Sequence, residues 1–140
     1  MELEASTVID RPVATVWDWY AIHHVENHPR WDPTIELENP TGGPLGVGTV
    51  VKRRSTRLEP PTEGTMEIVE FESEKIMRAN IQDGPMNIDG WARFAAAGEN
   101  QTKLTIGGEF PGTDDWITEM MRQGIEQSAA TIKSLIESET

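Results

Sequence analysis

The sequence has no cysteine. That absence excludes disulfide bonds, zinc–thiolate sites, iron–sulfur clusters and a cysteine nucleophile. Positive charge is scarce as well, because 12 Lys and Arg stand against 24 Asp and Glu, giving a formal net charge of -12. A surface of that sign repels phosphate backbones and anionic lipids. We therefore expect no nucleic-acid partner and no attraction to membranes through charge.

Long apolar runs are also missing. The sequence holds no apolar stretch of about 18 residues, so we expect no transmembrane helix and no membrane insertion. Its beginning, MELEASTVIDRP, lacks the basic and apolar regions of a secretory signal, which makes the cytoplasm the expected location. The 140 residues suit one domain, and no linker or internal repeat divides them. We expect a single domain over residues 1–140.

The first third of the chain predicts a strand followed by two short helices. Apolar and polar residues alternate over 3–9, which is typical of a half-buried strand. Val13, Val16, Trp17 and Tyr20 then lie at helical spacing. A second short helix is expected over 23–28. Pro29 should end that helix, because the residue before a proline disfavours helical backbone.

The middle of the chain predicts an antiparallel meander, and its end predicts one long helix. Short segments rich in strand-forming residues are separated by turn residues such as Asp-Gly and Pro-Pro. From residue 117 to residue 136, apolar or small residues recur every three or four positions, which predicts a helix of about 24 residues. The expected strands cover 34–38, 49–58, 64–72, 75–81, 86–96 and 102–110.

This order of elements predicts an α+β fold, with a curved antiparallel sheet of about six to seven strands around the C-terminal helix. A long helix with one apolar face must lie across the sheet. Its expected inner face carries Met120, Met121, Gly124 and Ser128. Small side chains leave room and methionine adapts to its neighbours, so we expect these four residues to border a ligand cavity.

Several motifs resemble a known superfamily over nearly the whole chain. They are IDRPVATVW at 9–17, NHPRWDP at 27–33, GVGT at 46–49 and IVEF at 68–71, followed by the long helix. The chain resembles the SRPBCC, or helix-grip, superfamily, which includes START domains, Bet v 1-like proteins and a polyketide cyclase/dehydrase group. The resemblance implies a cavity between sheet and helix for a hydrophobic or amphipathic small molecule. It implies no particular reaction.

Four of the twelve basic residues lie within 52–57, on an expected strand. Parity with Val51 favours an inward side chain for Arg53. A buried arginine needs a partner, such as Glu67 on the neighbouring strand or an oxygen of a ligand. The alternative, usual for charged runs on strands, is an ion-pair ladder with Glu67, Glu70 and Glu72 on a solvated face.

Further candidates for the cavity lie on the expected strands and among the tryptophans. Alternation places Asp89 and Trp91 on one strand face, and Asp89 or Glu109 would be a candidate general base if it faced the cavity. Solvent exposure is the ordinary state of both acids. Trp17, Trp19, Trp31 and Trp116 lie in or beside the expected helices and are candidates for a flat wall against a ring-bearing ligand, with core packing as the alternative for most of them. Trp91 is a further candidate for the ligand site.

His24 and His28 are four residues apart, a spacing that brings two imidazoles together on a helix. A metal site needs a third ligand, and Glu26 lies on another face, so we predict no metal site. Proton transfer by one histidine is a better-supported role than metal binding. The Trp31-Asp32 pair is expected to be structural, as the resemblance implies. We expect no cofactor.

Three functions remain open. The first is a cytoplasmic protein of the polyketide cyclase type that holds an apolar or polycyclic ligand, with Arg53, Asp89 or a histidine handling protons. The second is a carrier or sensor without catalysis, for a lipid or a quinone. The third is a protein-interaction module whose acidic surface meets a basic partner. The polarity of the cavity separates the first two, since a catalyst needs a convergent pair of polar groups.

Overall fold

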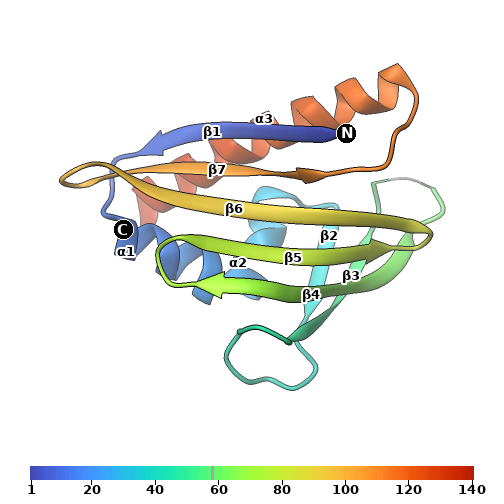
Figure 1. Cartoon of the computed structure of the whole chain (residues 1–140), viewed down its shortest axis with the longest axis horizontal. Coiled ribbons are helices and arrows are strands. Elements are labelled where there is room, and N and C mark those ends of the chain that lie inside the picture. The colour runs from blue at the N-terminus through green and yellow to red at the C-terminus, as the bar shows by residue number, and fades with distance from the viewer. Residues whose placement is uncertain (58) are drawn as a thin grey trace.

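Seven strands form one sheet in the computed structural model, which describes residues 1–57 and 59–140. Their spatial order is β1-β7-β6-β5-β4-β3-β2, and every neighbouring pair is antiparallel (Figure 1). The expected fold class and number of strands are confirmed. The strands are β1 (Glu2–Ile9), β2 (Ile35–Glu38), β3 (Val50–Ser55), β4 (Thr62–Glu72), β5 (Ile76–Asp83), β6 (Met86–Gly98) and β7 (Gln101–Glu109).

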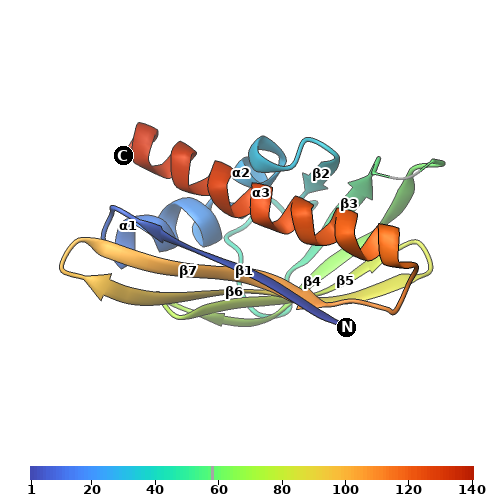
Figure 2. The ribbon, with the colours of Figure 1, turned by 90° about the horizontal axis from the view of Figure 1, so that it is seen from above.

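The helical segments all lie on one face of the sheet, and α3 crosses it from end to end (Figure 2). We call this the inner face and the opposite one the outer face. Among the described residues, no helix combines the length and apolar character needed to cross a bilayer. The segments are α1 (Val13–Trp17), the π-helical η1 (Asp18–Ile22), α2 (His24–Trp31) and α3 (Asp115–Glu139).

Two expected boundaries differ from the structure. Helix α2 continues through Pro29 to Trp31, so the prediction that Pro29 ends it is wrong. The proline removes only one backbone donor, and the last turn still closes with a 3.1 Å bond from the Asp32 amide to the His28 carbonyl. The strand expected over 49–58 is β3, which ends at Ser55. Its predicted last residue, Leu58, lies outside the described residues.

The core lies between the inner face and the helices. Trp17 of α1 packs its ring 5.0 Å from that of Phe71 and 5.1 Å from that of Phe94. Phe71 reaches this side because the β4–β5 register shifts between Ile68 and Glu70. An extra residue of this kind reverses the alternation that follows it. The bulge thus keeps both ends of β4 packed on one core.

Helix α3 is buried along its C-terminal half and less covered along its N-terminal half. Ile132 and Ile136 are fully buried, and Ala129 is nearly so. Near the start of the helix, by contrast, Trp116 is 64% exposed and Met120 is 38% exposed. The apolar contacts that hold the helix are therefore concentrated in its second half.

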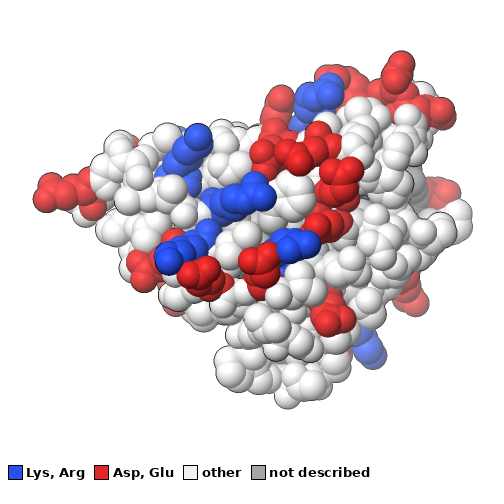
Figure 3. All heavy atoms as spheres, viewed as in Figure 1, with Lys and Arg blue, Asp and Glu red and all other residues white. Residues whose placement is uncertain are grey.

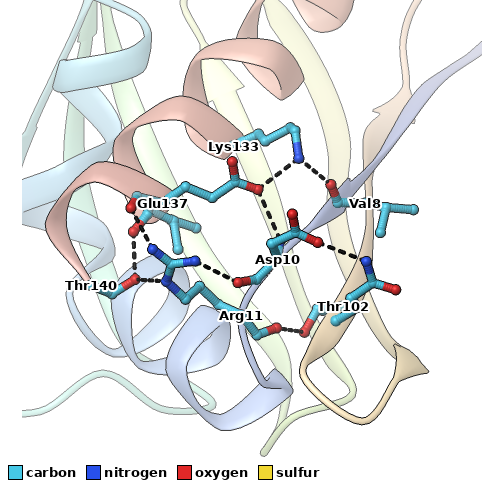
Figure 4. Close-up of polar contacts among 9 residues, drawn as sticks. Val8, Asp10, Arg11, Thr102, Lys133, Glu137 and Thr140 are labelled. Carbon is cyan, nitrogen blue, oxygen red and sulfur yellow. Dashed lines mark hydrogen bonds and ion pairs between the residues drawn. The ribbon is translucent and has the colours of Figure 1, made fainter.

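Polar contacts fix the same end of α3 to the β1–α1 connection (Figure 4). Glu137 Oε2 accepts hydrogen bonds from the Asp10 amide at 2.9 Å and from Lys133 Nζ at 2.6 Å. These contacts lower the pKa of Glu137. Arg11 donates from Nη2 to the Glu137 carbonyl at 2.6 Å and from Nε to Thr140 Oγ1 at 2.9 Å. The helix is therefore held in one register at this end.

The outer face carries charges of both signs side by side (Figure 3). Arg78 donates from Nε and Nη2 to the two carboxylate oxygens of Asp89, at 2.9 and 3.0 Å, and from Nη1 to Glu70 at 2.7 Å. On β1, Glu4 Oε2 accepts from Trp91 Nε1 at 2.6 Å and from Arg93 Nη1 at 2.8 Å. These partially exposed pairs leave the outer face polar and its charges matched.

Candidate functional site

A pocket of about 430 Å³ lies between the inner face of the sheet and the N-terminal half of α3. Its size is within the range of sites for small organic ligands. Most of its wall is apolar and comes from the central strands. The apolar residues of the sheet that line it are Met66, Met77, Ala79, Ile81, Ile88, Ala92 and Ile106.

The four residues predicted on α3 all line this pocket: Met120, Met121, Gly124 and Ser128. Gly124 contributes space, since a Cβ placed there would meet no atom within 4 Å. That a ligand touches these residues stays a prediction. The half of α3 with the fewest core contacts is thus the half that covers the pocket.

Arg53 enters the pocket from β3, on the side that parity with Val51 predicts. The strand register aligns Arg53 with Gly64 of β4, and Gly64 with Asp83 of β5. We call these three residues the inner row. A Cβ at Gly64 would lie 1.5 Å from the Gln82 carbonyl oxygen, so only glycine allows this approach of β4 to β5. With no side chain between them, Arg53 Nε donates to Asp83 Oδ1 at 2.8 Å.

The guanidinium of Arg53 is almost entirely removed from solvent, with 6% of the side chain exposed. Its Nη1 is buried and has no hydrogen-bond partner among the described residues. A buried donor without an acceptor costs about 1–3 kcal/mol, and more when it is charged. Its partner is Asp83, so the expected alternative of a solvated ladder with Glu67, Glu70 and Glu72 is wrong for Arg53. The inner row therefore places a buried guanidinium with an unpartnered nitrogen in the wall of a mostly apolar pocket.

Two histidines and a tyrosine form a polar part of the pocket wall near Arg53. His24 Nδ1 lies 3.1 Å from the Tyr20 carbonyl oxygen, and His28 Nδ1 lies 3.1 Å from His24 Nε2. Burial, followed by the nearby charge of Arg53, lowers the pKa of His24 to about 4. The pKa of His28 is also well below its usual value, through burial, His24, Arg53 and Arg57. Both rings are neutral near pH 7.

The Trp31-Asp32 pair has structural contacts at the edge of the same pocket. The Trp31 ring stacks on Tyr20 at 5.0 Å and on His28 at 4.7 Å. Asp32 accepts from the Thr34 hydroxyl and from Arg57 Nη2, each at 2.5 Å. Among the described residues, no group of three or more His, Asp or Glu side chains is placed to hold a metal ion.

Two candidates, Asp89 and Trp116, lie outside the pocket, which corrects their expected positions. Asp89 pairs with Arg78 on the outer face, and Glu109 is exposed beside it in the register. Trp116 is exposed and does not line the pocket. Trp91 borders the pocket, but its indole Nε1 reaches Glu4 on the outer face. The reason is alternation: Ile88, Ala92 and Phe94 face inward, so Asp89 and Trp91 between them face outward.

Two residues that were not among the sequence candidates belong to the site. Asp83 alternates with Met77, Ala79 and Ile81 on β5, so its inward direction was visible in the sequence. The sequence does not show that Asp83 pairs with Arg53, because this pairing depends on the register of three strands. Tyr20, the chain's one tyrosine, was assigned to an apolar helix face, and its burial beside the pocket raises its pKa.

Comparison with known proteins gives one family and many structural neighbours. A family model described as "Polyketide cyclase / dehydrase and lipid transport" matches residues 1–137. A search of curated proteins found no match. The crystal structure of TTHA0849 from Thermus thermophilus has 16% identity and a TM-score of 0.77, covering 99% of this chain and 98% of that one.

Two further structures share the fold at low identity. Zhui aromatase/cyclase from Streptomyces sp. R1128 has 12% identity and a TM-score of 0.73, with coverage of 98% of this chain and 93% of that chain. Norcoclaurine synthase from Thalictrum flavum, in complex with dopamine and hydroxybenzaldehyde, has 13% identity and a TM-score of 0.70. The coverage there is 100% of this chain and 88% of the synthase. These likenesses establish the helix-grip fold.

Proposed function

Because the chain belongs to the polyketide cyclase/dehydrase and lipid transport family, we propose that it binds an uncharged, largely apolar small molecule that carries a carbonyl oxygen. The observation that carries this proposal is Arg53, which lines a mostly apolar pocket and has one buried guanidinium nitrogen, Nη1, without a partner among the described residues. A carbonyl oxygen would accept from it, and a ring system would cover Met66, Ile88 and Met121.

The charge balance of the inner row favours a neutral carbonyl over a carboxylate. Asp83 already compensates the charge of Arg53, and both side chains are buried. A ligand carboxylate would bring a further negative charge into this environment, where Arg57, the other arginine that lines the pocket, is already paired with Asp32. A carbonyl oxygen would accept from the Arg53 guanidinium without adding charge. The ligand is therefore of the ketone or quinone type and not a fatty acid anion.

Binding of matched naphthalene probes tests this proposal. We expect 2-acetonaphthone to bind about tenfold more tightly than 2-ethylnaphthalene, because one hydrogen bond to a charged group contributes about 1.5–3 kcal/mol. 2-Naphthoate should bind more weakly than the ketone. Titration calorimetry or quenching of tryptophan fluorescence measures all three affinities.

The double variant Arg53→Met with Asp83→Val is the informative mutant, because it removes both buried charges together and leaves none unpaired. It should bind the ketone and the hydrocarbon equally. Arg78→Met on the outer face is the control and should keep the preference for the ketone. Equal affinity of the two probes for the wild type would refute the role of Arg53, and no binding of any probe would favour a protein-interaction module.

Catalysis is a second candidate, and the convergence of Arg53 with a histidine pair on one pocket favours it over simple transport. A donor on a carbonyl oxygen stabilises the negative charge that develops when a proton leaves the neighbouring carbon, the step that begins aldol cyclisation and dehydration. Proton–deuterium exchange at the methyl group of 2-acetonaphthone in D₂O, followed by NMR, separates the two functions. A catalyst accelerates the exchange and a carrier does not.

A further inference from the structure

His24 and His28 form a hydrogen-bonded pair whose direction is set by the backbone. They lie one turn apart on α2, where His28 Nδ1 is 3.1 Å from His24 Nε2. On its other side, His24 Nδ1 is 3.1 Å from the carbonyl oxygen of Tyr20. Both histidines line the pocket. The pair therefore connects a backbone carbonyl of η1 with the ligand space.

The partners determine where the protons lie. A carbonyl oxygen only accepts, so His24 Nδ1 carries a hydrogen and donates. In the neutral ring His24 Nε2 is then an acceptor, and His28 Nδ1 must be the donor in the second bond. A neutral His28 consequently has its lone pair on Nε2. Burial beside Arg53 and Arg57, which pair with Asp83 and Asp32, supports the neutral state of both rings.

The lone pair of His28 Nε2 has no hydrogen-bond donor among the described residues, since the contact with His24 uses the other nitrogen. Stacking of the ring on Trp31, at 4.7 Å and 15°, restricts its orientation. Two residues of the pocket wall thus carry complementary polar atoms without a partner among the described residues, a donor on Arg53 and an acceptor on His28.

We infer that His28 Nε2 is a second ligand anchor that accepts a hydrogen bond from a hydroxyl group, while Arg53 donates to a carbonyl of the same molecule. The inference rests on the proposed function and narrows it, from carbonyl compounds in general to hydroxylated ketones or quinones. His24 is a positioning residue that holds His28 as the Nδ1–H tautomer. An ether or methoxy oxygen at the same place has no hydrogen to donate. Its lone pair would face the lone pair of His28 Nε2 and be repelled by it.

The tautomers can be tested without a ligand. Long-range ¹H–¹⁵N correlation spectra of the wild type at about pH 7.5 should show His24 and His28 both protonated at Nδ1, the less common form of free histidine. Replacing His24 by Asn keeps a donor for the Tyr20 carbonyl, but the shorter side chain has no acceptor at the position of His24 Nε2. This variant should show His28 as a mixture of tautomers. A wild-type His28 protonated at Nε2 overturns the inference.

The ligand preference is tested with the 1-, 3- and 6-hydroxy isomers of 2-acetonaphthone and their methyl ethers. At least one hydroxy isomer should bind the wild type about tenfold more tightly than its ether. His28→Phe keeps an aromatic ring on Trp31 and should abolish this ratio, whereas His28→Gln, which keeps an amide oxygen, should retain part of it. Arg78→Met on the outer face is the control and should keep the ratio of the wild type.

The outcomes separate the inference from the proposed function. If the parent ketone binds in an Arg53-dependent way but every hydroxy isomer matches its ether, the His28 anchor is wrong and the proposed function stands. The His28 anchor is also wrong if His28→Phe still binds the hydroxy isomer more tightly than its ether by the wild-type ratio. If no ketone binds the wild type, the proposed function fails and the anchor with it.

Discussion

Each face of the sheet carries a row of three aligned residues with a glycine in the middle, but the two rows differ in their surroundings. On the inner face, Arg53 reaches across Gly64 to Asp83. On the outer face, Trp91 is aligned with Gly107, and Gly107 with Glu4; we call these three residues the outer row. The indole of Trp91 reaches the Glu4 carboxylate at 2.6 Å. In each row a central glycine lets two side chains from alternate strands meet.

Burial separates the two rows. The outer row is open to solvent, and Arg93 joins it by pairing with Glu4 and lying 4.9 Å over the Trp91 ring. Its polar groups can exchange partners with water. The inner row cannot, and it leaves Arg53 Nη1 without an acceptor among the described residues. An unsatisfied buried donor adds no stability, so this difference between the rows supports the proposed ligand role of the inner row.

The largest expected effect comes from breaking the inner row at Asp83. Asp83→Ala leaves the Arg53 charge buried and unpaired, and the free energy of unfolding should fall by about 3–5 kcal/mol. Denaturation by urea measures the change. The control is Asp89→Ala on the outer face, where the Arg78 guanidinium stays solvated and keeps Glu70. Similar losses in the two variants would contradict the difference between the faces.

The second-largest effect should come from acid, which is expected to lower the free energy of unfolding through His24. The pKa of His24 is about 4 in the folded protein and about 6.5 in the unfolded chain. Between these values the unfolded chain binds a proton that the folded protein does not, so stability decreases as the pH falls. The free energy of unfolding should drop by about 3 kcal/mol from pH 6.5 to pH 4, and His28 adds to the fall.

Unfolding midpoints in urea at several pH values test this dependence. His24→Asn should flatten the curve over that range. His23→Gln is the matched control, because His23 is exposed at the neighbouring position, and the fall attributed to His24 should persist in this variant. A wild-type stability that is constant from pH 6.5 to pH 4 would show that His24 is not held neutral by the fold.

A gain in stability is expected when both charges of the inner row are removed. In the variant with Arg53→Met and Asp83→Val, apolar groups of similar size replace a buried ion pair, which is neutral or stabilising by about 1–2 kcal/mol. The same protein should lose its preference for ketone probes. Thermal unfolding together with the probe titrations measures both properties. A variant that is much less stable and still prefers the ketone would contradict a ligand role for the row.

The smallest effect should come from the outer row. Glu4→Gln removes the charge that faces Arg93 but keeps an acceptor for the Trp91 indole, so stability should change by about 0–1 kcal/mol. Because the pair is exposed, raising the salt concentration should reduce the difference between variant and wild type. Urea denaturation at low and high salt measures it. A loss as large as that of Asp83→Ala would remove the distinction between the two rows.

The sequence by itself predicted the elements and the direction of many side chains. Alternation placed Arg53 on the inside with Val51, and helical spacing brought His24 and His28 together. These predictions succeed because the direction of a side chain depends on the local backbone. The misplacement of Asp89 was avoidable, since the apolar residues of β6 already marked the other face as the inner one.

The tertiary structure alone decided which of these residues form a site. Asp83 meets Arg53 through the register of β3, β4 and β5, and Arg53 lies 30 positions before it in the chain. The tertiary structure also decides that Arg53 Nη1 has no partner among the described residues, because this depends on all the residues that pack around it. Local patterns cannot encode such facts, because strand register and burial arise from contacts between segments that are distant in sequence.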